Sequence, residues 1–542
     1  MSDVPITRRL AEWIVDLRAS DIPERVREKA RYQVLNVLAA LHSGSRTPAG
    51  QAVHRAVAGW DKPGPCTVIP TGERFSAHEA VLVNSAFSMA LDYDDYLYMG
   101  HTGHSAVLAS LALCEALGRS TEDLLVAQVI ANEIGGRVGA SCVFGPQNGQ
   151  AWSFIHAVAG AAVASRLYRL TVEQTAHALS IALYQPPFTL WPGFMGPQSK
   201  VLTAAWPTVA GIQAAQFAAE GLTGAPRIFE DPRKGFWASF SYVPLPHLMS
   251  GFGQAWVTDT LTYKRYPGCA YVGTTLDALF EIRETFAQAA GAPLDPDQVD
   301  RVEVEASLLS VEMDNISREH VRPEEPLSPI NVNFSIPYNV AIALLAGRHT
   351  AAELSPAFLA EHEQRIRALA DRTALRHDWQ MTFEVVAAFD AVLGKSSVAA
   401  VLGPRDLVTL ARGYRDQLGG DRRSLDLSSL FTTHLPELFK RGRRALGRRG
   451  KGEPDLGEVD FSGFRMAFPA RVTVHTTDGR VFSARQDVPF GAPGQRRRFE
   501  TVEEKYRTEA GALGEDRVEN GIALVKRLEE VDVAALVAAV CA

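Results

Sequence analysis

Through about its first 260 residues, the chain places apolar side chains at the three- and four-residue spacing of amphipathic helices. The apolar residues 107–117 follow the short segment 101–105, which we therefore expect at the mouth of a buried helix. Capping boxes mark several helix starts: Ser76 with Glu79, Ser120 with Asp123, and Thr171 with Gln174. This part of the chain is predicted to be helical.

The spacing changes after Tyr266-Pro267. Residues 301–307 alternate between apolar and charged side chains, as a half-buried strand does. Two further alternating segments, 471–474 and 481–488, flank Asp478-Gly479, which predicts a two-strand hairpin. Between these strands, helical spacing returns over residues 338–346 and from Glu353, which forms a capping box with Thr350. This order predicts a small α/β domain.

The last third of the chain is less regular. Over residues 395–460 helical spacing gives way to a Gly- and Arg-rich run, which we interpret as an insertion. Thr501 with Glu504 then predicts the start of a final helical segment. At 542 residues the chain is too long for one hydrophobic core, and its length favours about two to four domains.

The charge balance argues against a polyanionic partner. The net charge is -7, from 55 basic and 62 acidic residues, so we expect neither nucleic-acid nor anionic-membrane binding by the whole protein. The basic run at 440–451 is interleaved with glycine and lacks stacking aromatic residues, which is typical of a solvated loop.

The cysteines and the N-terminus indicate a cytoplasmic protein. Five widely spaced cysteines without a CxxC pair give no disulfide framework, structural zinc site or iron-sulfur motif. Charged residues among the apolar ones near the N-terminus argue against a signal peptide. The long uncharged stretch 174–199 contains four prolines, which argue against a membrane-spanning helix.

The densest group of polar residues lies in segment 91–105. Asp92, Asp94 and Asp95 repel one another, so the folded protein must solvate them, pair them or raise the pKa of one. One interpretation is a helix end whose acids cap the next helix or face water. The other is a functional site, which the nearby His101 and His104 favour.

The two histidines are three residues apart, a spacing that can bind a metal ion. No third-ligand pattern such as HExxH accompanies them and Gly103 lies between them, so we expect no metal. A histidine at the mouth of a helix, oriented by Asp92, would instead serve as a general acid or base near neutral pH.

Two lysines lie in apolar surroundings, Lys200 and Lys264. Half-buried cations in a pocket suit a carboxylate substrate and an enolate-like transition state. The alternative for each is an ordinary surface lysine.

The order of these segments resembles the MmgE/PrpD superfamily, which includes 2-methylcitrate dehydratase, cis-aconitate decarboxylase and iminodisuccinate epimerase. No single motif is diagnostic, but their order and spacing together are specific. The matching segments are Leu91-Asp-Tyr-Asp-Asp95, Gly103-His-Ser105, Ala131-Asn-Glu133 with Arg137, Lys200, residues 211–215 and 221–224, Lys264-Arg-Tyr-Pro-Gly-Cys269 with Asp277, Phe334-Ser-Ile-Pro-Tyr338 with Ala341 and Gly347, and residues 472–479 with Pro489-Phe-Gly491.

The resemblance implies a mainly α fold with a smaller α/β lid: a discontinuous all-helical domain and an inserted α+β lid domain. We place the helical domain at 1–264, the lid at 265–492 including the insertion, and the completing helices at 493–542. The resemblance also implies a homodimer that uses no metal or organic cofactor.

Carried over by position, the resemblance implies catalytic roles for Asp92, His104, Lys200, Lys264 and Tyr338. The residues that we expect to contact the substrate are Tyr96, His101, Trp191, Arg265 and Cys269. The implied substrate is a small carboxylate, and the bond broken lies β to its carboxylate group.

The chain departs from the family pattern at several positions. Tyr96 stands where the family usually has Thr, and Ala151 and Gly273 stand where it has histidines, with His156 close to the first of these. The proline of the family's GHPS is also missing. Because polar groups are lost where aromatic residues gather, we expect a less charged or larger substrate than methylcitrate.

The sequence thus predicts a cofactor-independent lyase of the 2-methylcitrate dehydratase kind, in which His104 moves a proton next to a carboxylate. Dehydration and decarboxylation both fit these residues. Two alternatives stay open, an epimerase on the same scaffold and a non-catalytic ligand-binding relative. An iron-sulfur hydro-lyase would need three neighbouring cysteines, a spacing that this chain lacks.

Overall fold

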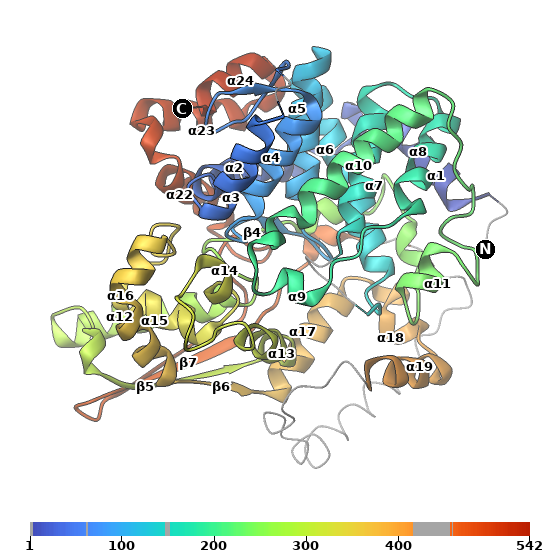
Figure 1. Cartoon of the computed structure of the whole chain (residues 1–542). Helices are drawn as coiled ribbons and strands as arrows, with labels where there is room; N and C mark the ends of the chain where they lie inside the picture. Colours follow the sequence, from blue (N-terminus) through green and yellow to red (C-terminus); the bar gives the residue numbers. More distant parts are fainter. Residues whose placement is uncertain (1–3, 61–62, 147–151, 416–455, 458, 542) are drawn as a thin grey trace.

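The computed structural model describes residues 4–60, 63–146, 152–415, 456–457 and 459–541. The basic run at 440–451, most of the predicted insertion and Ala151 lie outside the described residues. The fold is mainly α with a smaller α/β part, which confirms the predicted fold class (Figure 1).

The first half of the chain is helical, as predicted. Its helices are α1 (Ile6–Asp16), α2 (Glu24–Gly44), α3 (Pro48–Ala58), α4 (Ala77–Met89), α5 (Gly103–Leu117), α6 (Thr121–Ser141), α7 (Phe154–Leu167), α8 (Val172–Tyr184), α9 (Trp191–Phe194), α10 (Leu202–Ala219) and α11 (Phe236–Phe240). The capping boxes at Ser76, Ser120 and Thr171 open α4, α6 and α8, which confirms those predicted starts.

Helix α7 lies at the centre of this part and packs against α5, α6, α8 and α10. Nearly every residue of α7 is buried, which is typical of a helix that is apolar all round. The contact with α10 is close because Gly160 and Gly211 face each other's helix. A Cβ at Gly211 would lie 2.0 Å from the Ala157 carbonyl oxygen.

The α/β part contains one four-stranded sheet with the order β6-β5-β7-β8. Its strands are β5 (Val299–Ala306), β6 (Thr373–His377), β7 (Ala470–Thr476) and β8 (Val481–Gln486). β6 runs parallel to β5, while β7 is antiparallel to β5 and β8. The predicted strand at 301–307 and the hairpin at Asp478-Gly479 are confirmed, and Gly479 has the positive φ of 85° that the turn needs.

Helices surround this sheet and lead away from it. They are α12 (Val272–Ala290), α13 (Leu308–Arg318), α14 (Pro329–Val332), α15 (Ile336–Ala346), α16 (Pro356–Asp371), α17 (Trp379–Ala391), α18 (Val398–Val401) and α19 (Pro404–Arg415). α12 covers β7 and β8, and α15 packs on α12 and α16.

Two predicted helix starts are wrong. Thr350 and Glu353 do bond to each other, but α16 begins only at Pro356, where the Ser355 hydroxyl accepts from the Phe358 N–H. Thr501 lies inside a helix, because its hydroxyl donates to the Arg497 carbonyl one turn earlier. In both places a Ser/Thr–Glu pair occurs without forming the helix N-terminus.

The C-terminal helices return to the first half of the chain (Figure 1). α22 (Arg498–Glu509) and α23 (Glu515–Lys526) pack on α2, while α24 (Val533–Val540) contacts α5. Phe499 stacks on Tyr32 with ring centroids 4.2 Å apart. The predicted domain boundaries themselves stay predictions.

Among the described helices, none combines the length and the apolar character that crossing a membrane would require. Two short ribbons complete the fold: β1 (Cys66–Thr67) pairs with β2 (Arg74–Phe75), and β3 (Asp95–Tyr96) pairs with β4 (Thr262–Tyr263). The second ribbon matters for the site, because it joins the acidic segment to the segment that carries Lys264.

Candidate active site

The acidic segment turns sharply between α4 and α5. Asp92 has a positive φ of 49°, a left-handed conformation that an aspartate tolerates better than most residues. Pairing of β3 with β4 then places Lys264 beside Asp94, and the Lys264 N–H donates to the Asp94 carbonyl at 3.2 Å. Residues 170 positions apart in the sequence thereby meet.

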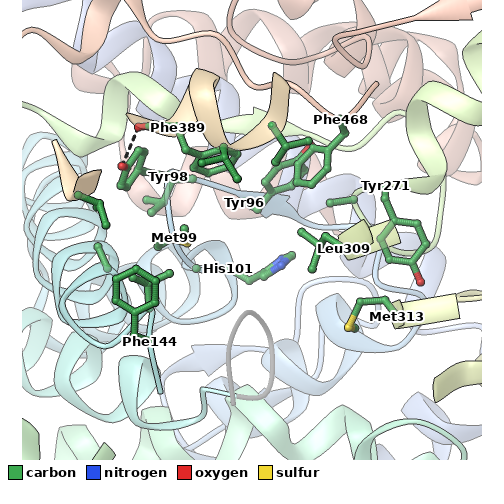
Figure 2. Close-up of a pocket in the computed structure, with 18 of the residues that line it drawn as sticks. Tyr96, Tyr98, Met99, His101, Phe144, Tyr271, Leu309, Met313, Phe389 and Phe468 are labelled. Atoms are coloured by element: carbon green, nitrogen blue, oxygen red, sulfur yellow. Dashed lines mark hydrogen bonds between the residues drawn. The ribbon is translucent and has the colours of Figure 1, made fainter. Parts of the chain in front are cut away.

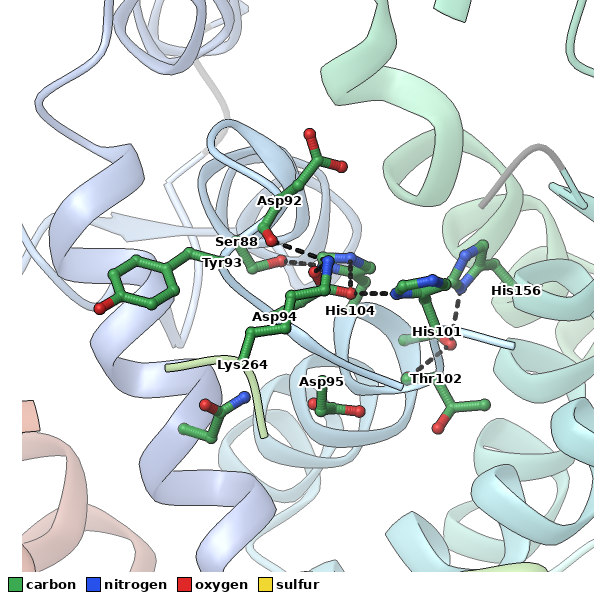
Figure 3. Close-up of polar contacts among 12 residues, drawn as sticks. Ser88, Asp92, Tyr93, Asp94, Asp95, His101, Thr102, His104, His156 and Lys264 are labelled. Atoms are coloured by element: carbon green, nitrogen blue, oxygen red, sulfur yellow. Dashed lines mark hydrogen bonds and ion pairs between the residues drawn. The ribbon is translucent and has the colours of Figure 1, made fainter. Parts of the chain in front are cut away.

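Asp94 is the centre of the resulting cluster (Figure 3). Its Oδ1 accepts from the Lys264 ammonium at 2.5 Å, while its Oδ2 lies 2.6 Å from His101 Nδ1 and 3.1 Å from His104 Nε2. Burial alone would raise the pKa of the Asp94 carboxyl, but Lys264 and the two imidazoles hold it well below its usual value. Asp94 is therefore a carboxylate at neutral pH.

His104 is fully buried at the start of α5. Its Nδ1 lies 2.7 Å from the Ser88 hydroxyl and its Nε2 faces Asp94. The predicted partner was Asp92, and this pairing is wrong. The left-handed turn at Asp92 points that carboxylate away from the histidines, as Figure 3 shows.

Asp92 instead pairs with Lys200 and accepts from the Asn333 amide at 2.6 Å. The Lys200 ammonium also lies 3.7 Å from the centroid of the Phe334 ring. Burial lowers the pKa of Lys200, although Asp92 opposes this shift. For Lys264 burial also acts to lower the pKa, but Asp94 and Asp92 outweigh it and the net shift is upward.

Next to the cluster lies a cavity of about 640 Å³ (Figure 2). Four of the predicted substrate-contacting residues line it: Tyr96, His101, Trp191 and Cys269. His101 thus borders the cavity with one edge and contacts Asp94 through Nδ1. Burial lowers the pKa of His101 and raises that of the Cys269 thiol to about 11. Both side chains are therefore mainly neutral at pH 7.

Two predicted residues lie elsewhere. Arg265 borders a separate small pocket, where its guanidinium lies 3.5 Å from Asp277 and 5.0 Å from the centroid of the Phe490 ring. The hydroxyl of Tyr338 lies 3.5 Å from Arg367, and the charged groups around it are Arg367, Asp371 and Glu363. In this conformation neither side chain joins the Asp94 cluster.

Sequence reasoning missed several contributors. Lys505 of α22 donates to Asn36 Oδ1 at 2.7 Å and to the Tyr93 carbonyl, and burial lowers its pKa to about 7. No motif marks Lys505, because it lies about 400 residues from the acidic segment. Ser88 had a usable signal, since it precedes the acidic segment by one helical turn.

Of the departures from the family pattern, Ala151 lies outside the described residues. The nearby His156 lies beside His104, with ring centroids 6.0 Å apart, and its Nδ1 lies 3.0 Å from the Ser105 hydroxyl. A Cβ at Gly273 would lie 3.2 Å from Pro489 Cβ, so there is little room for a larger side chain there.

The part of the chain that the structure describes contains no group of three or more His, Cys, Asp or Glu side chains arranged to hold a metal ion. Cys269 borders the cavity, whereas Cys66, Cys114, Cys142 and Cys541 are buried elsewhere. The cavity therefore does not offer the three cysteine thiolates that an iron-sulfur cluster would need.

Comparison with known proteins identifies relatives of this chain. The cis-aconitate decarboxylase of Aspergillus terreus is 24% identical over 371 residues, which cover 65% of this chain and 74% of that protein. The cis-aconitate decarboxylase-like protein oryM of Aspergillus oryzae is 25% identical over 301 residues, covering 52% and 62%. The human cis-aconitate decarboxylase is 26% identical over 310 residues, covering 55% and 63%.

The family models give the broader assignment. The MmgE/PrpD N-terminal domain matches residues 8–247, and the MmgE/PrpD C-terminal domain matches residues 266–392. These two regions contain the acidic segment, both histidines, Lys200 and Asn333, and Lys264 lies in the short gap between them. The chain belongs to the MmgE/PrpD family.

Proposed function

We propose that this protein is a lyase that acts on an organic acid at the bond β to a carboxylate. One observation carries the proposal: Asp94, His101, His104 and Lys264 form one buried cluster beside the Lys200–Asp92 pair, and His101 of this cluster lines the cavity. Relatives named as cis-aconitate decarboxylases support the same class of reaction.

The histidine pair is the proposed proton carrier. His101 borders the cavity and reaches the substrate, while His104, at the family's histidine position, lies behind it on the same carboxylate oxygen. A neutral imidazole held by a carboxylate accepts a proton and is stabilised once charged. The pair can therefore remove a proton next to a carboxylate and return it.

The two ammonium groups are the proposed electrostatic contribution. Lys200 and Lys264 lie behind the cavity lining, Lys200 at 3.7 Å from the ring centroid of cavity-lining Phe334 and Lys264 on Asp94. From there they would stabilise the negative charge that builds on the substrate as a C–H, C–O or C–C bond breaks. Fixed cations in a water-poor site stabilise such charge more strongly than they would in water. In decarboxylation, carbon dioxide leaves and the bonding electron pair stays on carbon. The histidine pair, after taking up a proton from solvent, delivers that proton to the carbon.

Dehydration, decarboxylation and epimerisation share this carbanion-like state, so the cluster alone does not choose among them. Decarboxylation is the reaction that the relatives' names favour. The proposed chemistry needs only side chains and no cofactor. A homodimer and a cytoplasmic location stay predictions.

The test is proton exchange. Unsaturated and hydroxylated acids are incubated with the protein in deuterated water, and NMR follows deuterium uptake and product formation. We expect at least one acid to exchange or react, and the variants His101→Asn and His104→Asn to slow this by about a hundredfold. The control is His362→Ala on α16, which should retain the full rate.

Acids that bind without exchange or conversion would contradict the lyase and identify a non-catalytic relative. Full activity of His104→Asn would remove His104 from the mechanism. Asparagine is chosen because it retains a polar side chain in a buried site.

A further inference from the structure

The cavity has a polar floor and apolar walls. Its floor includes His101 and Cys269, next to the Asp94 cluster. Away from this floor the walls are aromatic and aliphatic apart from Asp390, whose carboxylate accepts from the Val398 N–H at 2.6 Å (Figure 2). The Tyr98 hydroxyl is already bonded, because it donates to the Phe389 carbonyl at 2.9 Å. A molecule that fills this space therefore meets mainly apolar side chains away from the floor.

The two cations next to the floor are already paired. Lys264 lies against the Asp94 carboxylate and Lys200 against the Asp92 carboxylate, so the two positive charges meet two negative ones. Among the described residues that line the cavity there is no lysine or arginine. An acid with three carboxylates would bring charges that this lining does not balance, and burying unpaired charge is costly.

Part of the apolar wall comes from α17, α18 and α19. Val386 and Leu407 line the cavity and are 61% and 57% exposed, although both are large aliphatic residues. Apolar side chains that remain open around a cavity are typical of a ligand-binding surface. Val385, Val398 and Leu402 continue the same wall.

Much of this wall lies outside the residues that the family models match. The C-terminal match ends at residue 392, whereas Val398, Leu402, Leu407 and Phe468 all follow it. Apart from Lys264, the polar cluster thus lies within the matched regions, whereas part of the apolar wall lies outside them. This division favours shared chemistry on a different substrate.

We propose that the substrate carries an extended hydrocarbon arm, which lies against the wall formed by α17, α18, α19 and Phe468, with its carboxylate end at His101. The proposal takes the position of the carboxylate from the function proposed above. A cavity of about 640 Å³ has the size of sites that hold drug-sized ligands. A citrate-sized acid would leave most of the apolar wall uncovered.

The experiment measures binding, so it does not depend on turnover. Straight-chain monocarboxylic acids from butanoate to dodecanoate, and citrate and cis-aconitate for comparison, are titrated into the full-length protein by calorimetry. We expect affinity to rise by about fourfold for each added methylene until the cavity is full. Affinity that does not depend on chain length, or tighter binding of the tricarboxylates, would overturn the proposal.

A matched pair of variants on α19 locates the arm. Leu407→Asp places a charge in the cavity wall and should weaken decanoate binding at least tenfold while changing butanoate binding little. Val408→Asp is the control, because Val408 is 49% exposed on the same helix and is not among the lining residues. Equal effects of the two substitutions would contradict the assigned wall.

The two proposals fail in different ways. If binding strengthens with chain length but no acid undergoes proton exchange, the proposed hydrocarbon arm is supported and the proposed lyase activity is contradicted. If short polycarboxylates are turned over and a longer chain does not increase affinity, the proposed lyase activity is supported and the proposed hydrocarbon arm is contradicted.

Discussion

A single buried carboxylate organises the site at the scale of the residue. Asp94 faces one ammonium and two imidazoles, and it is the carboxylate that all three groups contact. A buried charge of this kind is stable only while its partners remain in place. Asp94 is therefore the position at which a small chemical change should have the largest effect.

Asp94→Asn should lower the free energy of unfolding by about 3–5 kcal/mol, because it leaves the Lys264 ammonium buried without its nearest carboxylate. Urea denaturation followed by circular dichroism measures this loss. Asp297→Asn is the control, since its ion pair with Arg365 is exposed and should cost less than about 1 kcal/mol. Equal losses for the two variants would contradict the assigned role of Asp94.

Asp95 should make stability depend on pH. Burial and the neighbouring Asp94 raise its pKa to about 6, against about 4 in an unfolded chain. Between these values the folded state binds more protons, so the free energy of unfolding falls as pH rises from about 4 to 6, by about 3 kcal/mol in all. Asp95→Asn should make this decline shallower.

Asp277 should contribute to the decline that remains in Asp95→Asn. Burial also raises the pKa of Asp277 to about 6, which gives the same sign over the same pH range. Denaturant titrations at pH 4, 5, 6 and 7 measure the free energy of unfolding of the unsubstituted protein and of Asp95→Asn. An unchanged slope in Asp95→Asn would show that Asp95 does not titrate in this range.

At the scale of the element, the start of α5 positions the histidines. Gly103 opens this helix because the chain passes very close to Asp95 there: a Cβ at Gly103 would lie 2.1 Å from Asp95 Oδ2 and 2.8 Å from Val37 Cγ2. The acidic segment and α5 can therefore pack this closely only because residue 103 has no side chain.

Gly103→Ala should therefore destabilise the protein by about 1–3 kcal/mol, as overpacking of a core does, and should displace His104. Thermal unfolding and the rate of proton exchange measure the two effects. Gly463→Ala is the control, since no atom lies within 4 Å of its Cβ position and its φ is not in the positive range that alanine disfavours. A Gly103→Ala protein with full stability would show that α5 can shift without cost.

At the scale of the whole molecule, the site depends on the far end of the chain. Lys505 of α22 supports the acidic segment through the Tyr93 carbonyl, and Arg31 of α2 binds Glu529 through two nitrogens at 2.7 Å each. The C-terminal helices therefore close the helical part and hold its acidic segment in position.

Removal of residues 496–542 should abolish cooperative folding, because it exposes the face of α2 that α22 and α23 cover. Solubility after expression and the presence of a single denaturation transition are the measurements. A truncated chain that unfolds cooperatively at the same urea concentration as the full-length protein would contradict this role.

Much of the fold could be predicted because its signals are local. Helical spacing and the caps at Ser76, Ser120 and Thr171 depend on neighbours three or four residues away, and the Asp478-Gly479 hairpin on neighbours across one turn. The caps predicted at Thr350 and Thr501 failed because the same residue pair also forms inside turns and helices.

The amino-acid sequence by itself determined which chemical groups are present: three clustered carboxylates, two histidines at a helix mouth and two lysines in apolar surroundings. Only the tertiary structure decided how they pair. The left-handed backbone at Asp92 turns its carboxylate toward Lys200, so Asp94 is the carboxylate that contacts the histidines. Asn333 and Lys505 contact this region from segments that are distant in the sequence. Such pairing depends on packing between remote segments, for which neighbours along the chain carry no signal.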